Sequence, residues 1–394
     1  MTERPDVFCL RAEALQALKA ALAKEPSRLD PAQRLLRQQA DEALKVSPLS
    51  VTDKQRIPPS GDKHDYLSLG LYWWPHPNRR NGLPYCQRDG MINPDNQQGT
   101  DRMSLGRMVR TVEILALAYY LLERDMYGEH AGRMLRTWFL DPDSRMNPHL
   151  QYAQTIPGRK KITGLGIIDS LTFTCVVDAV GLLRSCRAWT QDDRQGMLDW
   201  FGAFLKWLQT SKHGRKEGRR KNNHGLWYHV QIVSYALFLG KYELAEQIVT
   251  YCRKRRIKQQ ILPDGRQHYA LQRTRTFHYS TYNLTAWFSM AAMAERLGID
   301  LWNYSSKDGR GIRKALDFLL PYADPGRSWP YEDSSFQRTK LLPLLYRAAS
   351  VYRDRSYEEN AQKFVSENSE TNDSVHETYI LETFCRARQH QLSF

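Results

Sequence analysis

Two short clusters in the sequence hold side chains that could transfer a proton. The first, Asn222-Asn223-His224-Gly225, follows a charged run at residues 212–221 and opens an apolar segment with helical periodicity. Asparagine is favoured at a helix start, where its side chain accepts from free backbone N–H groups, so a capped helix with a structural histidine is the alternative. The second cluster, at residues 273–284, adds guanidinium, imidazole and phenol groups from Arg273, Arg275, His278, Tyr279 and Tyr282. Neither cluster offers a carboxylate.

This set of groups suits proton abstraction next to a carboxylate without a metal ion. A sugar uronate carries its C5–H beside the carboxyl group, and that proton is hard to remove while the carboxylate is charged. Amide hydrogen bonds and a guanidinium or protonated imidazole would neutralise the carboxylate and stabilise an enolate-like transition state. A tyrosine or histidine would then take the proton, and the 4-O-glycosidic bond would leave by β-elimination.

Other reaction types lack their sequence signals. The paired carboxylates of glycoside hydrolases are not obvious, and no GxGxxG or GxxxxGK[ST] phosphate loop is present. No GxSxG nucleophile elbow occurs. The cysteines form no CxxC pair and no Cys/His ligand spacing, so a structural zinc is not expected, and whether any of them pair is left open. They are Cys9, Cys86, Cys175, Cys186, Cys252 and Cys385.

The composition favours an acidic partner. Lysine and arginine number 57 against 43 aspartates and glutamates, a net charge of +14. Such an excess indicates a nucleic acid, an acidic membrane face or an acidic polysaccharide. The 10 Trp, 21 Tyr and 13 Phe residues do not separate these partners, because sugars and bases both stack on aromatic rings. No apolar run approaches the roughly 20 residues that span a bilayer, and no signal peptide is visible.

Helical periodicity dominates the chain. Apolar residues recur at helical spacing in segments that we expect to be helices: 12–23, 31–46, 102–124, 127–139, 166–187, 191–211, 223–240, 242–256, 278–297, 311–321, 338–353, 357–367 and 374–388. There is no βαβ alternation and no convincing series of strands and turns. We therefore expect one all-α domain over residues 1–394, an (α/α) toroid of about six to seven helical hairpins with long rim loops, and an α-solenoid as the alternative.

Long irregular segments should collect on one rim of such a toroid and carry function. The longest, at about 47–100, is rich in proline and glycine and centres on Tyr72, Trp73 and Trp74. These rings form either a binding wall for a ring-shaped ligand or a hydrophobic plug. Further loops are expected at 141–162, 213–221, 262–277 and 323–337. Two of these loops hold candidate substrate-binding residues: Asn147, His149, Tyr152, Gln154 and Tyr331. For the group at 147–154, a network that only holds the loop is the alternative.

These residues resemble the alginate lyase superfamily of polysaccharide lyases. The resemblance covers roughly residues 60–350 and rests on five motifs: Tyr66 to Pro75, Gly82 to Pro94, Asn147 to Gln154, Asn222 to Gly225 and Arg273 to Asn283. Within the superfamily, the chain looks closest to polysaccharide lyase family 38 and less close to family 5. The resemblance implies a toroid that cleaves β-linked uronans such as polymannuronate or glucuronan, with no metal and no cofactor. We expect a periplasmic or secreted location, and a cytoplasmic one is left open.

The family motifs assign roles to four residues. Asn223 and Arg273 match the positions that neutralise the uronate carboxylate. His224 matches the histidine beside the reacting sugar, as base for one epimer or as an aid to neutralisation. Tyr279 matches the catalytic tyrosine that serves as acid, and also as base in syn elimination. The family often has an acidic residue a few positions before the arginine, but this chain has none there, so the sequence leaves open what orients Arg273.

Other residues are expected to contact the substrate or to be structural. The remaining substrate-binding candidates are Tyr72, Trp73, Trp74, Asn222, Arg275 and His278. For His278 and for His229 a structural role is favoured, and the run at 253–256 is expected to be a solvated face. Two other functions stay open: a glycoside hydrolase on the same toroid, with Asp169 or Glu332 as its carboxylates, and a non-catalytic α-solenoid that binds a polyanion. The preferred uronan, endo or exo action and the oligomeric state do not follow from the sequence.

Overall fold

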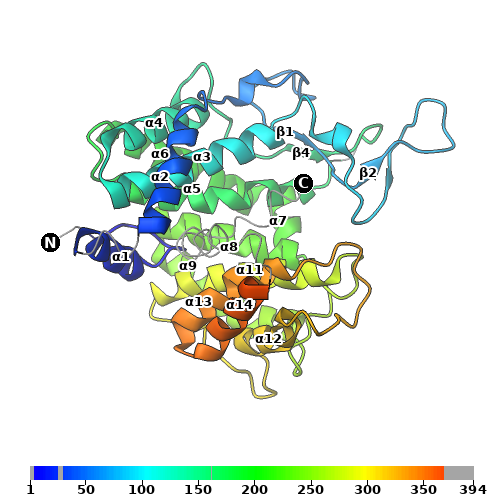
Figure 1. Cartoon of the computed structure of the whole chain (residues 1–394). Helices are drawn as coiled ribbons and strands as arrows, with labels where there is room; N and C mark the ends of the chain where they lie inside the picture. The colour runs from blue at the N-terminus through cyan, green and yellow to red at the C-terminus, as the bar shows by residue number, and fades with distance from the viewer. Residues whose placement is uncertain (1–3, 25–29, 161, 368–394) are drawn as a thin grey trace.

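The computed structural model describes residues 4–24, 30–160 and 162–367 (Figure 1). Its helices are α1 (Ala12–Lys24), α2 (Asp30–Leu44), α3 (Arg102–Leu122), α4 (Asp125–Leu135), α5 (Phe173–Leu182), α6 (Gln191–Thr210), α7 (Lys212–Gly218), α8 (Asn223–Phe238), α9 (Tyr242–Tyr251), α10 (Ile257–Gln260), α11 (Thr276–Glu295), α12 (Ile312–Leu319), α13 (Leu342–Tyr352) and α14 (Arg355–Glu367). Short 3-10 or π turns precede or extend several helices, among them η5 (Leu165–Thr172) and η6 (Cys252–Arg256). The helix expected at 374–388 lies outside the described residues.

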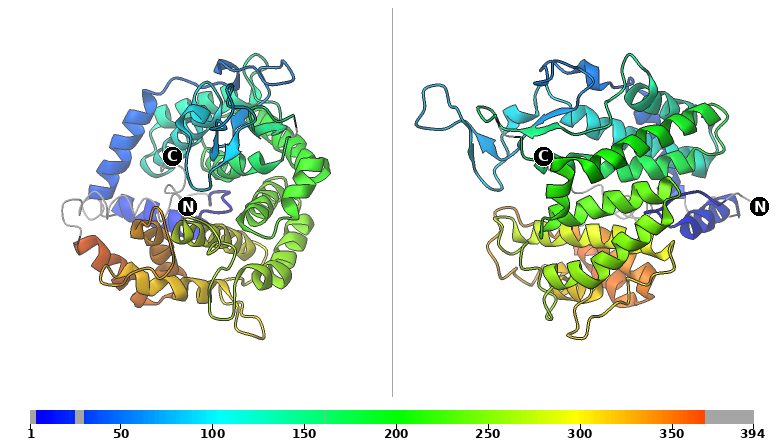
Figure 2. Two further views of the ribbon diagram at one scale, coloured as in Figure 1. Left: turned by 90° about the vertical axis from the view of Figure 1, so that its right-hand side faces the viewer. Right: turned by 180° about the vertical axis from the view of Figure 1, so that it is seen from behind.

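The helices follow one another around a ring, which is clearest in the left view of Figure 2. Neighbours along the chain pack together: α3 lies against α4 and α5, and α8 lies against α9 and α11. Nearly all residues of α8 and α11 are buried, as expected for helices that are apolar on almost every side. The expected all-α toroid is therefore confirmed.

The long loop at 47–100 holds short strands that the sequence analysis did not predict. β1 (Leu67–Leu69) pairs in parallel with β4 (Tyr152–Thr155), and β2 (Trp73–Trp74) pairs antiparallel with β3 (Cys86–Gln87). Each strand has two to four residues, too few to show an alternating pattern in the sequence. Figure 1 shows β2 on an arm that projects from the helical body.

The loop expected at 213–221 and the solvated face expected at 253–256 are each wrong in part. Residues Lys212–Gly218 form α7, which Ser211 caps by accepting a hydrogen bond from the Gly214 N–H. Glu217 of this helix is buried. Arg256 is buried as well, and its guanidinium donates to the backbone oxygens of Gly218 and Arg220. A charged residue can be buried when it has partners, and a run of charges gives no sign of which member has them.

One stretch among the described residues, Leu165–Leu182, is long and apolar enough to cross a membrane by length and composition. Two-thirds of this 18-residue window (67%) is buried inside the protein, as in the core helix of a folded domain. The stretch is η5 followed by α5, so the single helix expected at 166–187 is divided and ends earlier.

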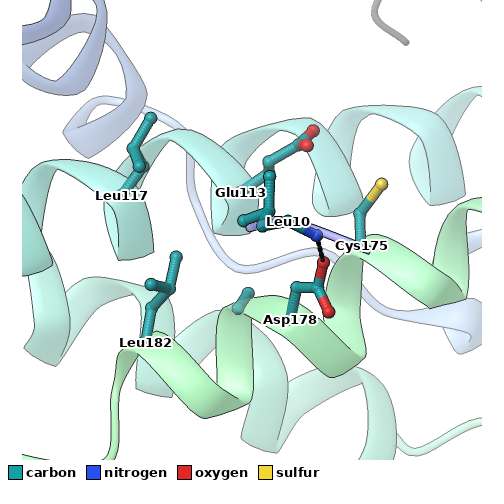
Figure 3. Close-up of a pocket in the computed structure, with 7 residues that line it drawn as sticks. Leu10, Glu113, Leu117, Cys175, Asp178 and Leu182 are labelled. Carbon is teal, nitrogen blue, oxygen red and sulfur yellow. Dashed lines mark hydrogen bonds between the residues drawn. The ribbon is translucent and has the colours of Figure 1, made fainter. Parts of the chain in front are cut away.

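A buried carboxylate of α5 fastens the N-terminal segment. Asp178 accepts hydrogen bonds from the backbone N–H groups of Phe8, Cys9 and Leu10, at 2.8 to 3.3 Å. Figure 3 shows its contact with Leu10 beside a small pocket that Cys175 also lines. Burial raises the pKa of Asp178 to about 7, and the backbone hydrogen bonds oppose this rise. Within the described residues no disulfide joins Cys9, Cys86, Cys175, Cys186 and Cys252; Cys385 lies outside the described part.

Candidate active site

The two sequence clusters meet at the N-terminal turns of α8 and α11. The helices pack against each other, and the rings of Trp227 and Tyr282, near the start of each helix, have centroids 5.3 Å apart. Gln260 of α10 links the start of α8 to the middle of α11. Its amide nitrogen donates to the carbonyl of Asn222, and its amide oxygen accepts from the indole N–H of Trp287. The turns that carry the two clusters therefore lie side by side.

Tyr279 lies at the centre of a chain of polar contacts. Its hydroxyl oxygen accepts a hydrogen bond from Nη2 of Arg273 at 2.7 Å and lies 3.0 Å from the hydroxyl of Tyr72. The guanidinium carbon of Arg273 also lies 3.8 Å from the centroid of the Tyr279 ring. Burial, and then the neighbouring Tyr72, raises the pKa of Tyr279, while the charge of Arg273 opposes the rise. The phenol is therefore protonated at neutral pH, with a cation in place to stabilise the phenolate when the proton leaves.

Arg273 is oriented by an acidic residue that the sequence analysis missed. Asp89, from the long loop at 47–100, accepts hydrogen bonds from Nη2 of Arg273 at 2.5 Å and from Nε at 3.1 Å. The same carboxylate accepts from the backbone N–H and the hydroxyl of Thr274. Although burial would raise it, the contacts with Arg273 hold the pKa of Asp89 below its usual value. Asp89 thus supplies the acidic partner that is missing just before Arg273, and 184 residues separate the pair, so no local motif reveals it.

His224 is held by a second acidic residue that the sequence analysis missed. Its Nδ1 lies 2.5 Å from Oε1 of Glu217, and Oε2 of the same carboxylate accepts from Nε of Arg220 at 2.6 Å. The side chain of Glu217 is 1% exposed and that of His224 is 17% exposed. Because Nδ1 is occupied by Glu217, Nε2 is the ring nitrogen of His224 left for a ligand. The sequence analysis missed Glu217 because this residue lies in a charged run that also holds exposed lysines and arginines.

The asparagines at the start of α8 are not ordinary helix caps. Asn222 occupies the N-cap position but makes no capping hydrogen bond with its side chain, and Asn223 is already the first helical residue. Asn223 is 6% exposed. Among the described residues, Oδ1 of Asn222 and Nε1 of Trp227 are buried without a hydrogen-bond partner. Buried polar atoms need a partner from solvent or a ligand, so the capped-helix interpretation leaves these side chains unexplained.

The two tryptophans of the long loop form β2, and an arginine guanidinium lies near each of their rings. The rings of Trp73 and Trp74 are half-buried in β2, which does not fit the hydrophobic plug. The guanidinium of Arg159 lies 4.4 Å from the Trp73 ring centroid, and that of Arg88 lies 5.3 Å from the Trp74 centroid. Tyr72 is the member of this triplet that reaches Tyr279.

The loop candidates at 147–152 are engaged with acidic residues of the protein. Asn147 donates from Nδ2 to Asp62 at 2.9 Å and to Asp65 at 2.7 Å. Nε2 of His149 lies 3.0 Å from Oδ1 of Asp65. Tyr152 is half-buried at the start of β4. For Asn147 and His149 these contacts favour the network that holds the loop, and a role in substrate binding stays a prediction.

Gln154 belongs to a saturated network around Asp169. Its amide nitrogen donates to Oδ1 of Asp169 at 2.8 Å. Arg102 donates to both carboxylate oxygens from Nη2, and the hydroxyls of Tyr66 and Ser68 donate to Oδ2. A buried carboxylate with so many donors is not free to act as the acid or base of a hydrolase, which weakens that use of Asp169.

Arg275, His278 and Tyr331 contact the segment at 329–340, although the ring of His278 also lies edge-on to the ring of Tyr279, with centroids 5.1 Å apart. Arg275 is buried and its Nε donates to the hydroxyl of Ser335. Nδ1 of His278 lies 2.8 Å from Nζ of Lys340. Tyr331 is half-buried and packs on a tryptophan of the loop at 323–337. The binding roles of these three residues stay predictions.

His229 follows His224 on α8 but has the surroundings of a structural residue. It is buried, and its Nδ1 lies 2.5 Å from the carbonyl oxygen of Gly225. Burial, with the nearby charge of Arg256, lowers its pKa to about 3, so the ring is neutral. No group of three or more His, Cys, Asp or Glu residues that could hold a metal occurs within residues 4–24, 30–160 and 162–367. The metal-free reaction nevertheless stays a prediction.

Comparisons with known proteins bear on this site. A family model described as alginate lyase matches residues 50–329. The chain is similar to an alginate lyase from Bacteroides ovatus of known crystal structure, with 39% identity, coverage of 95% of this chain and 99% of that one, and a TM-score of 0.89. It also shares its fold with alginate lyase A1-III from Sphingomonas species A1, at 18% identity, 91% coverage of both chains and a TM-score of 0.56. A histidine-to-alanine variant of A1-III complexed with a tetrasaccharide gives 17% identity, 91% coverage of both chains and a TM-score of 0.58. No curated protein matches the chain.

The helical toroid and these matches define an enzyme of the polysaccharide lyase class. The chain belongs to the alginate lyase family, because the family model spans most of its length and a relative of 39% identity covers nearly all of it. The resemblance drawn from the motifs is confirmed at this level. Membership of a lyase family argues against the hydrolase and against the non-catalytic α-solenoid.

Proposed function

We propose that this enzyme cleaves β-1,4-linked uronans, polymannuronate or glucuronan, by metal-independent β-elimination and releases 4,5-unsaturated oligouronates. The observation that carries the proposal is the connected group of Asp89, Arg273, Tyr279 and Tyr72. It presents a protonated phenol beside a fixed guanidinium, which are the groups that elimination next to a carboxylate requires. The alginate lyases among its structural relatives support an acidic polysaccharide as the substrate.

In the proposed reaction, the uronate carboxylate lies against the start of α8. Asn223 donates to the carboxylate through its amide, and Arg273 adds positive charge, so negative charge that develops on the sugar is stabilised. For one epimer His224 removes the C5 proton through Nε2. For the other, Tyr279 removes it as the phenolate that Arg273 stabilises, which forms when the phenol first gives its proton to solvent. The C4–O4 bond then breaks, C4 and C5 form the double bond, and the phenol of Tyr279 protonates the departing O4.

The test is a direct assay on defined polymers. The protein is mixed separately with polymannuronate, glucuronan and polyguluronate, and the ultraviolet absorbance of the new C4=C5 bond is followed with time. We expect a rise with polymannuronate or glucuronan, and mass spectrometry should show oligomers whose unsaturated end is lighter by one water than a hydrolytic product. Products of hydrolytic mass without absorbance, or no cleavage of any acidic polysaccharide, would contradict the proposal.

A further inference from the structure

We propose that Glu217 is a positioning residue that fixes the proton of neutral His224 on Nδ1 and so leaves Nε2 as the proton acceptor. This inference rests on the proposed function, because it concerns the histidine that faces the reacting sugar. Glu217 lies outside both sequence clusters and reaches His224 from the preceding helix, α7.

The first step of the argument is the chemistry of the contact atoms. An ionised carboxylate only accepts hydrogen bonds, and the Nε–H of an arginine only donates. Oε2 of Glu217 accepts from Arg220 at 2.6 Å, and Oε1 lies 2.5 Å from Nδ1 of His224. Nδ1 must therefore carry the proton of this contact. In a neutral imidazole the other nitrogen then has the lone pair.

The second step is the rigidity of the arrangement. Glu217 is almost fully buried, so water does not compete for its oxygens. Arg256 packs beside it by donating to the carbonyl oxygens of Gly218 and Arg220 at the C-terminal end of α7. A buried carboxylate that holds one ring nitrogen of a histidine fixes both the tautomer and the ring orientation. Such contacts belong to catalytic sites where the free nitrogen accepts a proton.

The structure predicts how Glu217→Gln would fail. A glutamine side chain has one acceptor oxygen and one donor nitrogen in place of two acceptors. Because Arg220 can only donate, the oxygen of the amide should face Arg220 and its NH2 should face Nδ1. Nδ1 of His224 would then have to accept, so the proton would move to Nε2. The nitrogen that faces the sugar would become a donor and could no longer take the C5 proton.

A second substitution should reverse this effect. In Glu217→Gln combined with Arg220→Met, no donor remains to hold the amide oxygen, so the amide can rotate and accept from Nδ1 again. Arg220→Met alone should keep the proton on Nδ1, because Glu217 is still present. Glu243→Gln on α9 is the matched control, since the same chemical change is made at an exposed position.

The tautomer is measured by nitrogen-15 NMR of labelled histidines, at a pH where titration shows the His224 ring to be neutral. The signals of His224 are identified by their loss in His224→Gln. We expect Nδ1–H in the wild type, in Arg220→Met and in Glu243→Gln, and Nε2–H in Glu217→Gln with return to Nδ1–H in the double variant. On a uronan whose cleavage is lost in His224→Gln, kcat of Glu217→Gln should fall by roughly 10²- to 10⁴-fold with little change in KM, and the double variant should recover part of it.

Three outcomes would overturn the inference, and the first two concern the tautomer. One is an Nε2–H tautomer in the wild type, and the other is unchanged Nδ1–H together with unchanged kcat in Glu217→Gln. Thermal melting of each variant shows whether it is folded; a folded double variant without recovery would also count against it. A wild type that is inactive on every uronan would contradict the proposed function instead, while the NMR result would still report on Glu217.

Discussion

The hydroxyl of Tyr279 has one partner that can only donate. Arg273 donates to its oxygen at 2.7 Å, so the phenolic proton of Tyr279 points elsewhere, toward Tyr72 or toward a substrate. This leaves the proton available to a departing O4. The same guanidinium then stabilises the phenolate that forms, which is a condition for a tyrosine with a raised pKa to act as an acid and be regenerated.

Replacing Tyr279 by phenylalanine should abolish turnover but leave polymer binding nearly intact. The substitution removes only the hydroxyl that transfers the proton, so we expect kcat to fall by at least roughly 10²- to 10⁴-fold. Absorbance of the unsaturated product measures kcat, and titration calorimetry with polymannuronate measures binding. Tyr282→Phe is the matched control. Full activity of Tyr279→Phe, with loss in Tyr282→Phe, would move the acid role to Tyr282.

Replacing Asp89 by asparagine should weaken the orientation of Arg273. The carboxylate accepts two hydrogen bonds from Arg273 and further ones from Thr274, whereas an amide has a single acceptor oxygen. We expect kcat/KM to fall by about 10- to 100-fold, as when a residue that orients a metal ligand is replaced. Asp95→Asn, an exposed position in the same loop, is the control. Equal kcat/KM in the wild type and Asp89→Asn would show that Arg273 does not need this partner.

At the scale of elements, the long loop at 47–100 must dock closely on the start of α11. Gly90 has a φ of +74°, and a Cβ at this position would lie 2.4 Å from the hydroxyl oxygen of Thr274. Gly61, in the same loop, has a φ of +82°, and a Cβ added there would have no other atom within 4 Å. The two glycines thus share the backbone conformation and differ in whether a side chain would separate the loop from the site.

Gly90→Ala should therefore reduce activity more than Gly61→Ala. Both substitutions strain a left-handed residue by about 1–2 kcal/mol, but only the first pushes Asp89 away from Arg273. We expect similar melting temperatures for the two variants and a kcat/KM that is lower by about tenfold or more in Gly90→Ala alone. A parallel loss of kcat/KM in both variants would mean that backbone strain, rather than docking at Thr274, causes the effect.

The contact between α5 and the N-terminal segment should respond to pH. Asp178 has a usual pKa of 3.8 that burial raises to about 7 in the folded protein. The folded state therefore binds this proton more tightly than the unfolded state. The stability that this proton contributes is fully present below the unfolded pKa and is lost as pH rises through about 7.

Asp178→Asn should remove this pH dependence. Urea denaturation measures the free energy of unfolding of the wild type and of the variant at each pH. Between about pH 5 and about pH 8, the wild type should lose stability relative to the variant. Taking the difference cancels the other titrating groups, which both proteins share. At each pH the variant also loses acceptors for the N–H groups of Phe8, Cys9 and Leu10, worth about 1–3 kcal/mol. If the difference in free energy of unfolding between the two proteins were the same at both pH values, the raised pKa of Asp178 would be contradicted.

At the scale of the whole molecule, the sequence predicts features that rest on local patterns. It does not predict those that rest on contacts between distant segments. The long, largely apolar segments of α8 and α11 indicate helices that are buried on nearly every side, and together with the helical periodicity of the other segments they predicted the helical toroid. The clusters at Asn223 and Tyr279 were visible because each is contiguous in sequence. Asp89 and Glu217 could not be recognised in the sequence, because each contacts a partner on another element. The short pairing of β1 with β4 is likewise a contact between distant segments.

The net charge of +14 should make substrate capture depend on salt. A polyuronate carries one negative charge per sugar, and a cationic surface raises its local concentration through a field that salt screens. The screening length falls from about 10 Å at 0.1 M to about 3 Å at 1 M salt. The contacts of Tyr279 with Arg273 and Tyr72 are shorter than this length and are partly buried, so the chemical step should be screened much less.

We therefore expect KM for polymannuronate to rise several-fold between about 0.05 M and about 0.5 M sodium chloride, while kcat changes little. A short oligomannuronate has fewer charges and should show a smaller rise in KM, which separates attraction of the polymer from effects on the site itself. Initial rates over a range of substrate concentrations at each salt concentration measure both constants. A KM that is independent of salt would show that the excess charge takes no part in capture. A fall in kcat with constant KM would place the salt-sensitive step within the group of Asp89, Arg273 and Tyr279.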